Sequence, residues 1–180
     1  MPAWPVEFRV AHGLLRKPLP GDAPALFDGV GGDPAVTRYL GWTTHTDIAQ
    51  TRQQISYELA RWQRDVARTW VLVADGDDAA GGLFQLIGQG HALRLGFALA
   101  RRLWGRGLAC EALQAVVDLA FDRAGVFRVD AVCDAENRRS SATLIRAGLP
   151  FEARLGRYIL HPNVSPLPRD VLIHAKVRTS

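Results

Sequence analysis

The chain has 180 residues, of which 48% are apolar and 22% are charged, a composition typical of globular proteins. This length suffices to bury an ordinary hydrophobic core, so intrinsic disorder and fibrous repeats are excluded. Prolines and charges interrupt the N-terminal region and no window approaches roughly 18 apolar residues, so we expect a cytoplasmic protein with no membrane segment. Cys110 and Cys133 are the only cysteines and the five histidines stand far apart, so no metal site is expected.

The charge is unevenly distributed along the chain. Residues 1–90 carry 8 basic and 10 acidic residues, a net −2, whereas residues 91–180 carry 14 and 8, a net +6. All the basic residues except Lys17 and Lys176 are arginines, whose planar guanidinium group suits phosphate. The C-terminal half therefore favours an anionic ligand, with a solvated arginine-rich surface as the alternative. Nucleic-acid binding is not favoured, because the arginines are not interleaved with a series of stacking aromatic residues.

The pattern of prolines and apolar residues predicts one domain spanning residues 1–180. No proline falls between Pro34 and Pro150, and neither repeats nor linkers interrupt that stretch. Thr46 and Asp47 can cap an amphipathic helix whose apolar positions recur from residue 48 to 66. Further expected elements are strands at 70–74, 82–87 and 93–99, a helix at 107–121, a strand at 127–133, a helix at 139–147 ended by Gly148, and strands at 154–160 and 171–177. This order predicts an α/β or α+β fold with a mixed sheet.

Residues 93–109 form a predicted strand, a glycine-containing loop and the start of a helix. Helix N-termini carry unpaired N–H groups and partial positive charge, and glycines let a phosphate approach the backbone closely. Gly105 and Gly107 therefore predict an anion cradle, unless they only shape a tight turn. A nucleotide-hydrolysing P-loop is excluded because Leu108 and Ala109 follow Gly107 in place of Lys and Ser/Thr. A dinucleotide-binding fingerprint matches only in fragments.

Arg102, Gly105 and Gly107 fill the pattern Arg/Gln-x-x-Gly-x-Gly/Ala, and here the sequence resembles the acyl-coenzyme A loop of the GNAT acetyltransferase superfamily. Residues 134–149 are similar to that superfamily's later Asn-x-x-Ser…Gly-Phe segment, with leucine replacing the aromatic residue. Residues 38–45, 157–161 and 169–171 resemble the branch that contains ribosomal-protein alanine N-acetyltransferases.

The resemblance implies a mixed, strongly twisted sheet flanked by helices, in which two strands splay apart to form an acyl-CoA cleft. Strand backbone and loop amides would hold the donor, acetyl-CoA, with no metal involved. The implied donor-binding residues are Phe97, Ala98, Leu99, Arg102, Leu103, Trp104, Gly105, Arg106, Gly107, Leu108 and Asn137. Arg101, Arg102, Arg106 and Arg146 are candidates for pairing with the donor phosphates, unless they are solvated surface charges.

The implied activity is N-acetyl transfer to a primary amine, either a protein N-terminus or a small amine, by direct attack in a ternary complex. Leu144 replaces the tyrosine that serves many members as general acid, and Arg94 replaces a glutamate common in the ribosomal-protein branch. Ser140 matches the proposed acid of that branch, unless it only caps the following helix. Trp42 and His45 are expected to bind the acceptor, unless they are a core tryptophan and a histidine of the helix-capping region.

Other assignments stay open at the level of sequence. Candidates for the general base are His45, Glu152, Tyr158 and His161. Cys110 could form a covalent intermediate or could simply pack against the sheet. A non-catalytic acyl-CoA sensor is the alternative function, given the two missing side chains. The acceptor, the length of the acyl group and the oligomeric state, a homodimer included, are not predicted.

Overall fold

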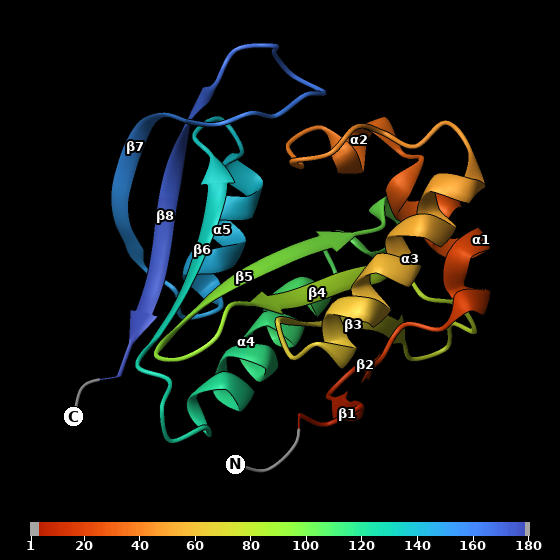
Figure 1. The fold of residues 1–180 in the computed structure, drawn as a ribbon, viewed down its shortest axis with the longest axis horizontal. Helices are drawn as coiled ribbons and strands as arrows, with labels where there is room; N and C mark the ends of the chain where they lie inside the picture. The colour runs from red at the N-terminus through yellow and green to blue at the C-terminus, as the bar shows by residue number, and fades with distance from the viewer. Residues whose placement is uncertain (1–3, 179–180) are drawn as a thin grey trace.

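The structure is a computed structural model that describes residues 4–178 and is built on one eight-stranded sheet (Figure 1). The order across the sheet is β1-β2-β3-β4-β5-β6-β8-β7. Only β5 and β6 pair in parallel among the described strands, and the other neighbours are antiparallel. The strands are β1 (Glu7–Val10), β2 (Gly13–Arg16), β3 (Ala67–Ala74), β4 (Gly82–Ile87), β5 (Ala92–Leu99), β6 (Arg128–Asp134), β7 (Phe151–Ile159) and β8 (Arg169–Val177).

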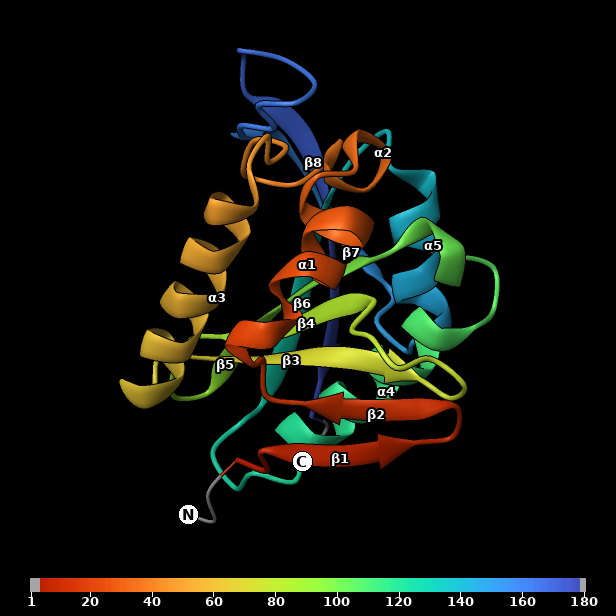
Figure 2. The ribbon, with the colours of Figure 1, turned by 90° about the vertical axis from the view of Figure 1, so that its right-hand side faces the viewer.

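Helices cover both faces of this sheet (Figure 2). α1 and α3 lie against one face, and α4 and α5 lie against the other. The helices are α1 (Ala23–Leu26), α2 (Pro34–Thr37), α3 (Ile48–Gln63), α4 (Leu108–Phe121) and α5 (Arg138–Arg146), with short 3-10 turns at Pro20–Asp22 and Arg101–Leu103 and a π turn at Phe27–Gly31. The expected mixed sheet flanked by helices is thus confirmed. The longest described helix, α3, has 16 residues, and no described helix is both long and apolar enough to cross a membrane.

The predicted elements lie where the sequence placed them, with small shifts at their ends. Asp47 caps α3 by accepting a hydrogen bond from the Ala49 N–H (2.7 Å), and Gln50 completes the capping box. The helix ends at Gln63 instead of residue 66, because Asp65 adopts a left-handed backbone (φ 60°) that a helix cannot continue through. The expected strand at 154–160 begins earlier, at Phe151.

An aromatic cluster anchors the N-terminal strands to the sheet. Trp70 of β3 is fully buried, and Trp4, Phe8 and Trp62 pack edge-on against it at centroid distances of 5.4–6.2 Å. Its indole N–H donates to the Pro5 carbonyl (3.0 Å), so the polar atom is satisfied as well. Strands β1 and β2, which the sequence analysis did not predict, are stabilised by this packing.

The parallel pairing of β5 and β6 stops halfway along both strands. Residues 92–95 of β5 pair with 128–131 of β6, and no further register follows. Beyond that point β5 stays bonded to β4 as far as Leu99, while β6 stays bonded to β8 as far as Asp134. Each strand therefore follows its own neighbour, and the two separate toward α2 and the β7–β8 loop (Figure 1). The sheet opens at this point, as the predicted splayed strands require.

Candidate active site

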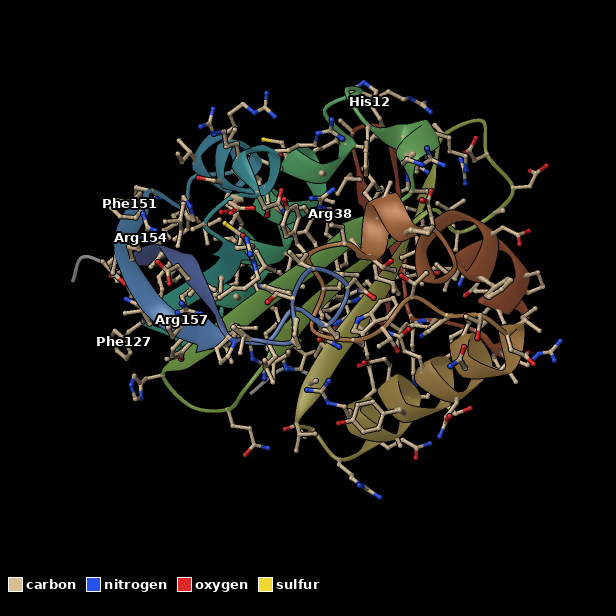
Figure 3. All side chains as sticks on the ribbon, turned by 90° about the horizontal axis from the view of Figure 1, so that it is seen from above. His12, Arg38, Phe127, Phe151, Arg154 and Arg157 are labelled. Carbon is tan, nitrogen blue, oxygen red and sulfur yellow. The ribbon has the colours of Figure 1, made fainter. Side chains whose placement is uncertain are left out.

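A cleft of about 1250 Å³ occupies the opening between β5 and β6. Most of its wall is formed by the separated ends of these strands, by residues 103–105 and 107–111, and by one side of α5. Val36, residues 39–41 and the start of the β7–β8 loop line its other end. Seen from above, the exposed Arg38 lies between the N-terminal helices and the β6–α5 side of the molecule (Figure 3).

The glycine loop forms the part of the cleft suited to a diphosphate. Gly105 and Gly107 have φ values of 76° and 79°, a left-handed conformation that favours glycine. A Cβ at either position would meet no atom within 4 Å, so the backbone lies open. Gly107 is the N-cap of α4, whose first N–H groups and positive dipole end face the same space. The residues present therefore fit the pyrophosphate of a coenzyme A molecule.

Trp104 fixes the loop to the end of β5. Its indole N–H donates to the Leu99 carbonyl (2.7 Å), and the Arg139 guanidinium lies 4.2 Å from the ring centroid. The N–H of Ala100 donates to the carbonyl of Gly81, the residue before β4, so the backbone groups of Ala100 point toward β4. Along a strand, the N–H and C=O groups of successive residues point alternately to one neighbouring strand and to the other. Phe97 and Leu99 therefore direct their backbone groups to the open edge of β5, whereas those of Ala98 point toward β4.

The loop arginines lie outside the cleft wall. Arg102 forms an ion pair with Asp77, and Arg101 donates to Asp33 (2.6 Å). The exposed Arg106 is likewise not part of the cleft lining within the described chain. The cations that do line the cleft at this end are Arg139 and Arg146 of α5. Arg139 is not part of the loop motif. Only the tertiary fold brings it close to Trp104, so the motif could not predict this contact.

Ser140 lies in the first turn of α5 and lines the cleft. Asn137, not Ser140, caps this helix: its side chain accepts a hydrogen bond from the Ser140 N–H (3.1 Å). The capping alternative for Ser140 is therefore wrong. Burial raises the pKa of the neighbouring Cys133 thiol to about 11, although a hydrogen bond with Ser140 opposes the rise. The thiol at this point of the cleft is thus neutral at ordinary pH.

The two departures from the family pattern have structural explanations. Leu144 is fully buried in the core, so an apolar side chain fills its position. Arg94 lines the cleft, and its Nε donates to Asp130 (2.7 Å). The hydrogen bond to Asp130 raises the pKa of Arg94 above its ordinary value, against the effect of burial and with help from Tyr158. A permanent cation thus replaces a carboxylate at this position.

The structure separates the four candidate bases. Glu152 forms a double hydrogen bond with Arg128 (2.8 and 2.5 Å), which lowers the pKa of Glu152. Tyr158 contacts Arg94 and is about half exposed. His45 Nδ1 lies 2.7 Å from the Thr51 hydroxyl, and burial lowers the pKa of this histidine. Of the four, His161 alone is among the described residues that line the cleft.

Trp42 and His45 pack against each other instead of lining the cleft. Their rings lie 4.6 Å apart, and Tyr39, Leu40 and Gly41 form the wall in their place. Asn163 of the β7–β8 loop, which the sequence analysis missed, donates to the carbonyls of Thr37 and Trp42 (2.8 Å each) and accepts from the Thr44 N–H (3.0 Å). One side chain thereby joins the β7–β8 loop to the segment after α2. An asparagine in a loop gave no sequence signal for this contact.

Cys110 of α4 also lines the cleft and is partly exposed.

Among residues 4–178, no group of three His, Cys, Asp or Glu side chains could hold a metal ion.

The opened sheet and the glycine loop suited to a diphosphate are the features that the resemblance to acyl-CoA-dependent acetyltransferases implies. Residues 13–150 match the model of the "Acetyltransferase (GNAT) domain" family, so the chain belongs to the GNAT acetyltransferases. It is 31% identical over 148 residues, 80% of this chain and 82% of the relative, to the "Uncharacterized N-acetyltransferase p20" of Bacillus licheniformis.

The fold also occurs in solved structures of other acetyltransferases, two of which have coenzyme A or acetyl-CoA bound. The first is a ribosomal L7/L12 alpha-N-protein acetyltransferase, RimL, in complex with coenzyme A, with a TM-score of 0.80 and 21% identity over 97% of each chain. The second is the microcin C7 self-immunity acetyltransferase MccE in complex with acetyl-CoA and AMP, with a TM-score of 0.82 and 18% identity over 93% of each chain.

Proposed function

We propose that this chain transfers the acetyl group of acetyl-CoA to a primary amine by direct attack within a ternary complex. The observation that carries the proposal is the cleft itself, which joins the exposed loop amides around Gly105 and Gly107 to the open edge of β5. A diphosphate at the loop and an extended pantetheine arm along β5 fit that arrangement. The family assignment and the coenzyme A bound in fold relatives support the same donor.

The reaction needs an oxyanion donor and a proton for the departing thiolate. Because Phe97 directs its backbone groups to the open edge, its N–H is available to stabilise negative charge on the thioester oxygen. Ser140, on the α5 wall of the cleft, is the candidate acid for the thiolate. Holding the thioester and amine together removes the need for an acyl-enzyme, so neither Cys110 nor Cys133 has to act as a nucleophile.

The acceptor enters opposite the glycine loop, at the end of the cleft lined by Val36, residues 39–41 and the start of the β7–β8 loop. The name of RimL makes protein N-termini the first class to test, and small amines are the second.

The test is a thiol-release assay with acetyl-CoA and a panel of amines: peptides with different N-termini, aminoglycosides, polyamines and free amino acids. Amine-dependent release of coenzyme A, with a matching acetylated product in the mass spectrum, is the expected result. Tight acetyl-CoA binding with no turnover on any amine would favour a non-catalytic sensor instead.

A further inference from the structure

His161 occupies an unusual environment for a polar side chain. It is only 5% exposed, yet neither of its ring nitrogens has a hydrogen-bond partner within residues 4–178. Buried polar groups almost always have a hydrogen-bond partner, so a histidine without one is rare. His161 lines the large cleft, where a ligand could supply the missing partner.

The groups around His161 hold it without using its nitrogens. The Tyr39 ring packs edge-on against the imidazole at a centroid distance of 6.4 Å. Asp134 of β6 is fully buried, and its Oδ2 lies 3.8 Å from His161 Nε2, beyond hydrogen-bond distance. Arg169 of β8 donates to Asp134 at 2.5 and 3.1 Å and also pairs with Glu136. Asp134 and Glu136 share this one guanidinium group, so the cluster beside His161 keeps a net negative charge.

Burial would raise the pKa of Asp134, but the hydrogen bonds from Arg169 and the Glu136 N–H hold this pKa below its ordinary value. Asp134 thus remains an anion beside the ring. It can stabilise an imidazolium if His161 accepts a proton, as a carboxylate does in other His-containing sites.

Ser140 and His161 lie next to opposite faces of β6. Cys133 and Asp134 are consecutive strand residues, so their side chains point to opposite faces. Cys133 interacts with Ser140 of α5, whereas Asp134 faces His161 of the β7–β8 loop. The glycine loop and α5 bind the donor on one side of β6. His161 lies on the other side, from which the acceptor must come.

We propose that His161 is the catalytic base that takes the proton from the acceptor amine, a role that rests on the proposed acetyl transfer. The amine nitrogen bonds to the thioester carbon as its proton passes to an imidazole nitrogen. The carbon–sulfur bond then breaks, and Ser140 protonates the thiolate. The imidazolium returns its proton to solvent, and Ser140 regains one from solvent, so the products are the amide and the coenzyme A thiol.

The test compares His161→Gln with His91→Gln, a matched change at an exposed histidine of the β4–β5 turn that does not line the cleft. The acceptor is whichever amine the wild-type chain acetylates in the thiol-release panel. We expect His161→Gln to lower kcat by about 100-fold or more, within the usual range for general base catalysis. The donor Kd should not change, and His91→Gln should behave as wild type. Replacing His161 removes no protein hydrogen bond, so the variant should fold.

Two further measurements separate a base from a structural residue. The dependence of kcat on pH should differ in shape between wild type and His161→Gln, since a different group must then take the proton from the amine. Added imidazole should restore part of the activity of His161→Ala. A kcat within twofold of wild type, a change in acceptor KM alone, or pH profiles of the same shape in the two proteins would overturn the role of His161. If the wild-type chain acetylates no amine in the panel, the proposed function fails, and the role of His161 fails with it.

Discussion

Substitution of Gly107 tests the anion cradle, because the backbone strain and the charge can be varied separately. An alanine at this φ of 79° incurs about 1–2 kcal/mol of strain but no clash, since its Cβ would meet no atom within 4 Å. Gly107→Asp incurs a similar strain and adds a carboxylate beside the bound diphosphate. Two like charges 4 Å apart repel by about 1 kcal/mol in water and about 4 kcal/mol at an effective dielectric constant of 20.

We therefore expect Gly107→Asp to weaken acetyl-CoA binding at least tenfold relative to Gly107→Ala, which corresponds to about 1.4 kcal/mol. The assay is isothermal titration of each folded variant with acetyl-CoA. Gly90 supplies the control, because it has the same φ of 79° and equally open surroundings in the distant β4–β5 turn. Gly90→Asp should lower the melting temperature similarly without changing the donor Kd. Equal donor affinities of the Gly107→Asp and Gly107→Ala variants would refute the placement of the diphosphate.

Three further predictions concern the cleft side chains. Ser140→Ala should lower kcat by roughly 10- to 100-fold with an unchanged melting temperature. Asn137→Ala should instead lose the α5 cap and about 1 kcal/mol of stability, and kinetics and thermal melts on both variants check the two predictions. Cys110→Ala should retain most activity with intersecting double-reciprocal plots, and parallel plots or an acetyl adduct on the cysteine would contradict a ternary complex. The pKa of Cys133 rises from 9.0 to about 11 on folding, so the stability that its neutral thiol contributes is complete below pH 9 and is lost toward pH 11. In chemical denaturation, wild type should therefore lose up to about 3 kcal/mol more stability than Cys133→Ala over that pH range. Equal losses in the two proteins would count against the buried thiol.

Local sequence signals predicted those helices whose first residues are fixed by contacts or backbone conformations within a few residues of the chain. Asp47 fixed the start of α3 because its capping hydrogen bond is made within two residues of the chain. Gly107 marked the start of α4 for a similar reason, since the backbone conformation there favours glycine. Strands β1 and β2 have four residues each, too few for a periodic pattern, and depend on packing around Trp70.

Side-chain roles were harder to predict because they depend on distant contacts. Arg102 matches the loop motif, but its guanidinium group pairs with Asp77 on a neighbouring turn. The environment of His161 depends on Asn163 joining its loop to residues more than 100 positions earlier. The sequence could therefore name His161 as one of four candidate bases, and only the fold distinguishes it from the others.

The most direct test of the account is a map of backbone amide shifts by nuclear magnetic resonance as coenzyme A is added to the ¹⁵N-labelled chain. The account predicts the largest changes at Phe97, Gly105, Gly107 and Leu108, with little change in β1 and β2. Saturable binding that leaves these four amides unshifted would contradict the placement of the donor between β5 and β6.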